Sequence, residues 1–536
     1  MNLKRGAALL AVLIVGGMLG GAHGANAPLP PTGFTGNALD GQVDLAWQPV
    51  AGATYNIYRG LSVSTRTTLA TGITGTTYDD TTAANGTTYY YSVRAIVSGS
   101  ESADSLLLQA TAQARSCGSG NAIHVENCSP GSTRWKLAAA DPVSSGGVEG
   151  FATASSINKG GSLDLKINGA STTTIRAEIY RLGFYGGSGG RLVSTIRGIG
   201  GIAQPACNAG PPLDCSNWAT SATITTTAAW ASGVYFVRLV REDVAASDAT
   251  IMFVVRDDAR IANLLYSVPV DTYQAYNNYG GQSLYDFNST GSKATKVSFN
   301  RPYVQPRTAS MHDWFTRADL PLVSWLEQSG YDVSYGADTD LETSPVGTHK
   351  SYVLGPHSEY WSSSMRNALT NARDAGTSIF VAGSNAIYWR VRFEDFGRTL
   401  VCSKSTTADS GLTSRWRDAN LPENALLGQQ YVGDNATASF PLVVSAAQGQ
   451  DQIWRHTPLA TLAAGTTFSI GSALVGWEWD ARVANGFEPG NVITLASSPV
   501  TGGLTQTDGE QVNGSTNVNV TKYTAASGAL VFDTGT

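Results

Sequence analysis

The chain has 536 residues, a length that suggests about three domains of ordinary size. Its net charge is −6 with acidic and basic residues mixed throughout, so no basic stripe indicates nucleic-acid binding. Only 14% of the residues are charged and small residues are abundant, which favours a β-rich extracellular architecture over a cytosolic helical enzyme.

Residues 1–24 have the order of regions of an export signal. Lys4 and Arg5 precede an apolar run over residues 7–18, and small residues follow it. We expect cleavage after Gly24, which makes the mature protein secreted or periplasmic. The run is short for a membrane span and no later segment reaches its length, so no membrane association is expected after cleavage. A tethering N-terminal helix is the alternative.

The five cysteines are spaced for two disulfides, which export permits. Cys117 lies close in sequence to Cys128, and Cys207 to Cys215, so we expect these two pairings. Cys402 is left over, either as a buried inert thiol or as a nucleophile.

Residues 28–113 contain short segments in which buried-type and polar residues alternate, as in half-buried strands. These segments cover residues 43–47, 54–59 and 88–95. Their spacing suits a β-sandwich, and the region resembles a fibronectin type III module. That resemblance implies a spacer or binding module without catalysis.

Residues 114–258 form a second β-rich region. Strands are expected at residues 162–167, 174–180, 219–225, 233–239 and 250–256. The Gly-rich segment 180–191 between two of them lacks the Lys-Ser/Thr of a phosphate loop, and no helix pattern follows it. We therefore expect a turn that connects two strands.

The pattern changes in residues 259–536. Short apolar strands are expected at residues 261–267, 331–335, 351–355 and 377–382, with helices at residues 320–329 and from an N-cap at Ser362 to a stop at Gly376. Alternation of this kind predicts an α/β domain with a mostly parallel sheet. Such an arrangement resembles the glutamine amidotransferase fold. The expected fold is thus multidomain: a β-sandwich, a β-rich domain and this α/β domain.

Polar residues follow two neighbouring strands of that domain. His357 and Glu359 come after the strand at residues 351–355, and Asn385 follows the next strand. Ligands bind at the carboxyl ends of such strands, so these side chains are expected to face one pocket. The alternative is that they only cap loops. Ser384 lies at a strand-to-helix turn, but its surroundings are not the G-x-S-x-G of a nucleophile.

Tyrosines are concentrated just after the first strand of the domain. Residues 271–285 contain four of them, and Tyr303 follows shortly afterwards. Phenolates are hard anionic ligands that, together with a carboxylate, suit ferric iron. Packing or stacking on substrate is the alternative role.

Residues 114–500 resemble the large-subunit domain of the N,N-dimethylformamidase family. The shared motifs are RLGFYGG at 181–187, QAYN at 274–277, SFNRPY at 298–303, HSEYW at 357–361 and NAIYWR at 385–390. The resemblance implies a mononuclear ferric iron held by two tyrosines and one glutamate. Carried over, Glu359 is the carboxylate ligand and Tyr276 and Tyr303 are the phenol ligands, with Tyr285 a rival for either place.

The implied reaction is hydrolysis of an amide C–N bond by iron-activated water. His357 would move the proton, Asn385 would stabilise the oxyanion, and Glu478 would match a further acidic residue of the family's site. The substrate would be a small or polymeric amide. A small partner subunit, as in the family's enzyme, or a homo-oligomer is left open.

Two other functions remain as alternatives. One is a non-catalytic extracellular protein that binds carbohydrate or a surface and has a degenerate α/β domain. The other is polysaccharide hydrolysis by a carboxylate pair, Glu359 with Glu394 or Glu478.

Overall fold

The computed structural model of the protein describes residues 27–32, 34–38, 41–112, 117, 120–136, 147–242, 248–304, 315–344, 346–455, 457–506 and 509–536. Two compact units emerge: one contains Met1–Ser116 with Pro441–Leu474, the other Cys117–Phe440 with Val475–Thr536. The expected export signal, residues 1–24, lies outside the described residues. The division of the second unit at residue 258 stays a prediction.

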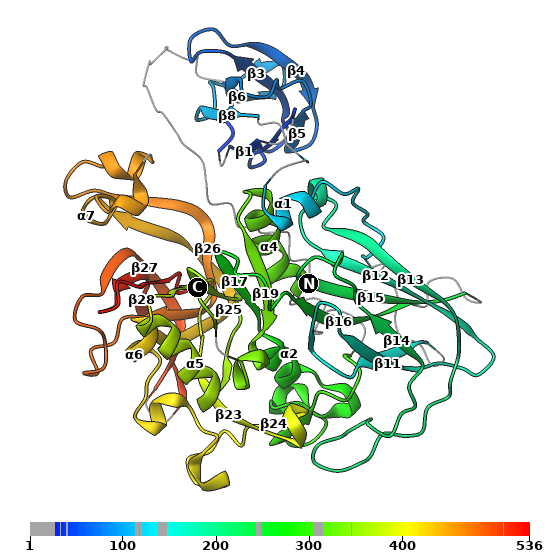
Figure 1. Ribbon diagram of the computed structural model, residues 1–536. Coiled ribbons are helices and arrows are strands. Elements are labelled where there is room, and N and C mark those ends of the chain that lie inside the picture. Colours follow the sequence, from blue (N-terminus) through cyan, green and yellow to red (C-terminus); the bar gives the residue numbers. More distant parts are fainter. Residues whose placement is uncertain are drawn as a thin grey trace. The chain divides into compact units, whose positions relative to one another are not determined.

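The N-terminal part of the first unit is a β-sandwich, drawn in blue in Figure 1. One sheet has the order β1-β2-β5, and in the other β4, β3 and β6 pair in that order, with β7 and β8 both pairing with β6. The strands are β1 (Thr35–Ala38), β2 (Val43–Ala46), β3 (Thr54–Gly60), β4 (Thr67–Ile73), β5 (Thr77–Asp80), β6 (Thr88–Val97), β7 (Ser100–Glu101) and β8 (Leu108–Thr111). Trp47, Tyr55 and Val93 are buried between the sheets. The fibronectin type III-like fold is confirmed.

The second unit begins with α1 (Ala122–Glu126) and continues as two sheets, ordered β10-β16-β15-β12-β13 and β14-β11-β9. Their strands are β9 (Glu149–Ala152), β10 (Ser156–Asn158), β11 (Ser162–Asn168), β12 (Thr174–Leu182), β13 (Gly190–Gly200), β14 (Ala222–Thr225), β15 (Gly233–Arg241) and β16 (Asp248–Arg256). All five expected strands are present. The Gly-rich segment forms the turn between β12 and β13, as expected.

A nine-stranded sheet, ordered β19-β17-β20-β22-β29-β28-β27-β25-β26, follows. The strands β17 (Leu264–Val268), β19 (Val333–Ala337), β20 (Ser351–Leu354), β22 (Ser378–Val381) and β29 (Leu530–Asp533) pair in parallel. The longer strands β25 (Gln430–Ser445), β27 (Ile493–Thr505) and β28 (Gln511–Thr524) pair antiparallel, and β26 (Thr467–Ala481) lies at the edge.

The prediction of a mostly parallel sheet is therefore wrong, because the sheet is largely antiparallel. The short parallel strands alternate with helices and are visible in the sequence. Residues 430–533 instead return in long antiparallel strands on the edge of the same sheet, and their polar, irregular pattern did not indicate strands.

The helices of this region are α2 (Val270–Tyr276), α4 (Leu320–Gln328), α5 (Ser363–Asp374) and α6 (Asn424–Leu427); α7 (Ala446–Gly449) belongs to the first unit. The expected N-cap of α5 is confirmed, since Ser362 accepts a hydrogen bond from the N–H of Met365. A small sheet, ordered β18-β24-β23-β21, consists of β18 (Lys296–Ser298), β21 (Tyr360–Ser362), β23 (Trp389–Glu394) and β24 (Thr399–Val401).

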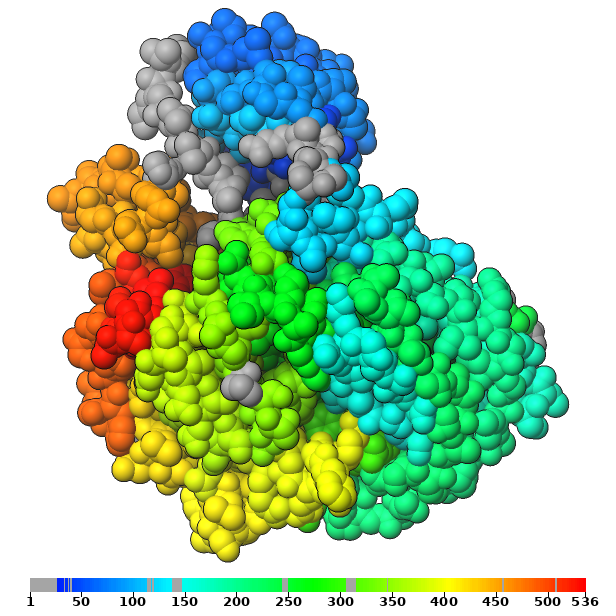
Figure 2. Space-filling model, in the orientation of Figure 1, coloured from blue at the N-terminus to red at the C-terminus, as the bar shows by residue number. Residues whose placement is uncertain are grey.

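The β-rich region and the nine-stranded sheet share one hydrophobic core. Tyr180 and Phe236 from the former pack in the same cluster as Tyr266 and Tyr335 from the latter. Figure 1 shows β15 and β16 beside β19, and in Figure 2 the teal surface before residue 250 meets the green surface after it. The two regions therefore pack directly against each other within the second unit.

Both expected disulfides, Cys117–Cys128 and Cys207–Cys215, are present. Cys402 is a free, buried thiol whose pKa is raised to about 12 by burial, which disfavours the thiolate that a nucleophile needs. Among the described residues, no helix is long and apolar enough to cross a membrane.

Candidate functional site

The site forms where α2 and the segment between β20 and β21 meet. Tyr276 is the last residue of α2, and Tyr285 lies in the loop that follows. Glu359 immediately precedes β21, and its main-chain N–H donates to Oγ1 of Thr272 on α2 at 3.0 Å. The helix is therefore bonded directly to the main chain of Glu359.

Glu359 is 2% exposed and accepts three hydrogen bonds from neutral donors. The phenol of Tyr285 donates to Oε1 at 2.8 Å, and the phenol of Tyr276 donates to Oε2 at 3.1 Å. Nε1 of Trp389 also donates to Oε1, at 3.0 Å. The two tyrosine rings stack with their centroids 4.3 Å apart. Two phenol oxygens thus converge on opposite oxygens of one carboxylate.

His357 lies between two carboxylates. Its Nε2 is 3.3 Å from Oε2 of Glu359 and 3.3 Å from Oε2 of Glu478. Nδ2 of Asn385 donates to Oε1 of Glu478 at 3.0 Å, and the main-chain N–H of Asn385 donates to Oδ1 of Asp480 at 2.8 Å. The φ of Asn385 is +55°, a conformation that is uncommon outside glycine and concentrated at functional sites.

Burial and the neighbouring charges set the protonation of the cluster. Burial alone would lower the pKa of His357, but Glu478 and Glu359 outweigh it and raise that pKa to about 10. Burial would raise the pKa of Glu359, but the bond and charge of His357 lower it overall. Burial and the charge of Glu359 raise the pKa of Tyr276 and Tyr285 well above 10. Without a cation, both phenols therefore keep their protons at neutral pH.

Lys404 completes the surroundings of Tyr285. Its Nζ lies 3.3 Å from the ring centroid of Tyr285 and 4.6 Å from that of Trp389. Within the described part of the chain this buried amine has no hydrogen-bond acceptor. Burial lowers the pKa of Lys404 to about 8, although the charge of Glu359 opposes that shift. A positive charge therefore stands on the ring of Tyr285, as in a cation–π contact.

The structure brings together Tyr276, His357, Glu359, Asn385 and Glu478, but not Tyr303. Tyr303 lines a separate small pocket with Gln274 and Arg398, and in the described chain no hydrogen bond or ring contact joins it to Glu359. Tyr285, the rival in that prediction, lies beside Glu359 instead. The ligand set itself stays a prediction.

Two residues of the site, Trp389 and Lys404, were not predicted from the sequence. Trp389 lies in the NAIYWR motif, so its presence near Glu359 had a signal, but its role as a donor did not. No sequence pattern indicated Lys404, because the position of its side chain depends on a backbone turn in which its φ is +52°. Glu394, one alternative carboxylate partner, instead forms ion pairs with Lys296 and Arg392, each at 2.6 Å.

The donor set fits a ferric ion. Among the described residues no three His, Cys, Asp or Glu side chains are grouped to hold a metal. Two phenols and one carboxylate, once deprotonated, present three anionic oxygens that match a hard trivalent cation.

Comparison with known proteins gives one family. The family model described as "N,N-dimethylformamidase beta subunit-like, C-terminal" matches residues 176–536. The N,N-dimethylformamidase beta subunit of Paracoccus aminophilus is 29% identical over 122 residues, which are 21% of this chain and 16% of that protein.

Two further proteins are similar over short stretches. An amylopullulanase of Thermoanaerobacterium saccharolyticum is 39% identical over 72 residues, 13% of this chain and 6% of that protein. The crystal structure of an Fn3-like protein from Clostridium thermocellum is 38% identical and covers 16% of this chain and 95% of that one, with a TM-score of 0.16. The chain thus spans 16% of the length of the first curated relative and 6% of the length of the second.

Proposed function

The chain belongs to the N,N-dimethylformamidase beta subunit-like family, and on this premise we propose that it hydrolyses an amide C–N bond with a mononuclear ferric iron held by Tyr276, Tyr285 and Glu359. One observation carries the proposal: the two phenol oxygens meet opposite oxygens of the same buried carboxylate. Glu359 keeps its place in the expected ligand set, and Tyr285 takes the place of Tyr303.

The bound iron would act as a Lewis acid that polarises the amide carbonyl and lowers the pKa of water. A cation that binds here would displace the phenol protons of Tyr276 and Tyr285. Those protons now bond to Glu359, so their loss removes one hydrogen bond from each carboxylate oxygen.

His357 is the residue that supports the proton transfer. Its Nε2 is held between Glu359 and Glu478, and both carboxylates favour the protonated ring. A proton held at Nε2 is available to the nitrogen of a leaving amine, which must be protonated as the C–N bond breaks.

Asn385 acquires a different role from the expected one. Its Nδ2 donates to Glu478, so we assign it to orienting that carboxylate against His357. Stabilisation of the oxyanion then falls to another group.

We further propose that the protein is exported, secreted or periplasmic, after removal of residues 1–24. The two disulfides support this, because such bonds persist in oxidising compartments. A small or polymeric amide met outside the cytoplasm is the proposed substrate.

The test is release of amine from a panel of amides, from dimethylformamide to peptides and N-acyl polymers, by the iron-loaded full chain. Glu359→Ala should abolish the release, whereas Glu394→Ala, which removes an ion-paired carboxylate elsewhere, should not. Iron-loaded protein that releases no amine from any member of the panel contradicts the proposal.

A further inference from the structure

The main chain between Tyr276 and Tyr285 is gathered around one guanidinium. Arg301 is 1% exposed, and in the described chain all of its hydrogen bonds go to main-chain carbonyl oxygens. These belong to Gln274 (3.3 Å), Asn277 (2.8 Å), Tyr279 (3.3 Å), Gln282 (2.7 Å) and Ser298 (3.1 Å). Four of the five lie within or beside the tyrosine loop, defined here as residues 274–285.

A buried charge without a carboxylate partner is costly unless dipoles surround it. The four carbonyls of the tyrosine loop must therefore keep pointing at Arg301. The backbone conformation of the tyrosine loop therefore depends on the position of the Arg301 backbone. The spacing of Tyr276 and Tyr285 depends on it in turn.

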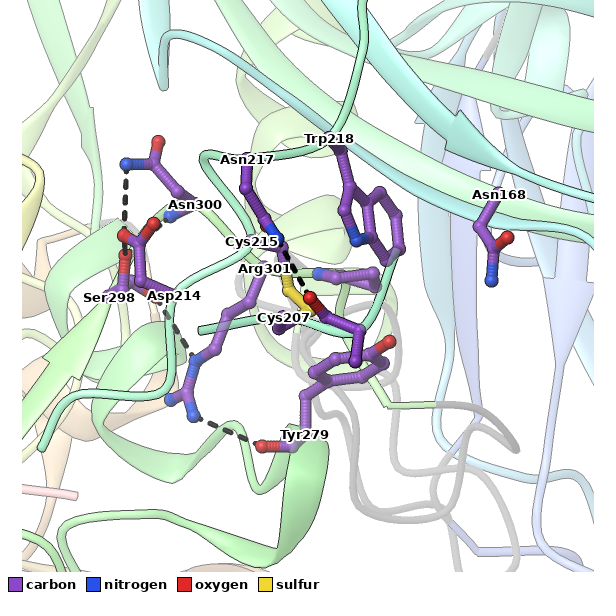
Figure 3. Close-up of a disulfide and its surroundings, with 12 residues drawn as sticks. Asn168, Cys207, Asp214, Cys215, Asn217, Trp218, Tyr279, Ser298, Asn300 and Arg301 are labelled. Carbon is purple, nitrogen blue, oxygen red and sulfur yellow. Dashed lines mark hydrogen bonds between the residues drawn. A yellow bond between two sulfur atoms is a disulfide. The ribbon is translucent and has the colours of Figure 1, made fainter. Parts of the chain in front are cut away.

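That backbone is in turn held by the loop that the Cys207–Cys215 disulfide closes. The N–H of Cys215 donates to the carbonyl of Asn300 at 2.7 Å. Asp214 accepts from Oγ of Ser298 at 2.6 Å and from Nδ2 of Asn300 at 3.2 Å. Figure 3 shows Asp214 beside Ser298 and Asn300, with Arg301 reaching toward Tyr279.

The disulfide loop also touches the tyrosine loop directly. Gly280 has φ +69°, and a Cβ there would come within 2.2 Å of Cδ2 of Leu213. Tyr279 packs against the apolar cluster of the disulfide with Phe151 and Trp218. Two independent routes, one through Arg301 and one through Leu213, thus connect the disulfide loop to the segment between the two tyrosines.

We propose that the Cys207–Cys215 loop, acting with Arg301, is a positioning device that sets the arrangement of Tyr276 and Tyr285. Only the closed disulfide holds the tyrosine loop in the order needed at Glu359, so the site is complete only in a chain that has been oxidised. The effect on iron binding rests on the proposed function, whereas the effect on the conformation of residues 274–285 does not.

The test compares two disulfides in the full chain. Cys207→Ser/Cys215→Ser opens the bond beside the site, and Cys117→Ser/Cys128→Ser opens the other as a matched control. In metal-free protein, hydrogen exchange of residues 274–285 should become faster in the first variant and stay unchanged in the second. Affinity for ferric iron, from competition with a chelator, should fall by about 10- to 100-fold only in the first, as for other residues that support metal ligands.

A structural weakening alone would not move the spectrum of the iron that remains. We expect the charge-transfer band of the first variant to shift, and that of the control to match the wild type. Unchanged exchange and unchanged affinity in the first variant overturn the proposal. If the wild type binds no iron, the proposed function fails, while the exchange comparison still decides the positioning role.

Leu213→Ala keeps the test decisive if the double variant does not fold. It removes only the side chain over Gly280. We expect faster exchange at residues 279–282 with β15 unchanged. No difference from the wild type at residues 279–282 contradicts a supporting role for the loop.

Discussion

Two of the buried clusters in which a carboxylate accepts a hydrogen bond from tyrosine, one around Asp80 and one around Glu359, are built differently. In the sandwich, Asp80 is bonded by the phenol of Tyr91 at 2.8 Å, by Oγ1 of Thr82 at 2.7 Å and by Arg59 at 2.6 Å. In the second unit, Glu359 is bonded by two phenols and shares His357 with a second carboxylate.

The difference lies in how many groups that can lose a proton each cluster contains. One guanidinium neutralises one carboxylate in the sandwich, so that cluster is complete without any ligand. The Glu359 cluster instead holds two carboxylates, one imidazole, two protonated phenols and the amine of Lys404. Similar groups thus make a structural cluster in one case and, in our proposal, a site that exchanges protons for a cation in the other.

The largest effect is expected from neutralising each carboxylate in turn. Glu359→Gln keeps the shape but removes the anionic ligand, so iron binding should fall to background by elemental analysis. Asp80→Asn is the matched change in the other cluster and should leave the iron content as in the wild type. Equal iron in the two variants would remove the distinction between the clusters.

The next largest effect on iron content is expected from removing the phenol oxygen of Tyr285 or of Tyr303. Tyr285→Phe should lose most of the iron and the visible band, because its oxygen is 2.8 Å from the Glu359 carboxylate. Tyr303→Phe should retain both, because that phenol lines another pocket. The reverse result in iron analysis and absorption spectra would restore the ligand set expected from the sequence.

A smaller effect is expected on stability in the sandwich. Asp80→Asn leaves Arg59 and Tyr91 without their acceptor charge, which should cost about 1–3 kcal/mol of the free energy of unfolding. Denaturant-dependent hydrogen exchange in β3 and β6 measures this in the full chain. A loss spread equally over β12 and β15 would contradict a local role.

The smallest effect is the pH dependence of that cost. Burial would raise the pKa of Asp80, but its bonds from Thr82, Tyr91 and Arg59 lower it overall. The resulting stability is present above the ordinary value of about 3.9 and is lost as the pH falls through the lower pKa of the folded state. The difference between wild type and Asp80→Asn in β3 exchange should therefore shrink in acid; a difference that grows there would contradict the assignment.

Local patterns were enough to predict part of this molecule. The sandwich strands, the five strands of the β-rich region, both disulfides and the Ser362 cap follow from alternation, spacing and capping chemistry. His357 and Glu359 were predictable as a pair because they follow a buried strand.

What the sequence did not indicate depends on contacts far apart in the chain. The antiparallel strands β27 and β28 are defined by pairing with each other rather than by an apolar pattern. Lys404 reaches Tyr285 across the fold, and only the folded loop decides whether Tyr285 or Tyr303 meets Glu359.

Iron content and the visible spectrum of the purified full chain, grown with ample iron, test the central claim most directly. We expect about one iron per chain and a phenolate-to-iron charge-transfer band, both absent in Glu359→Gln. Colourless, iron-free wild-type protein, or iron that persists unchanged in Glu359→Gln, would contradict it.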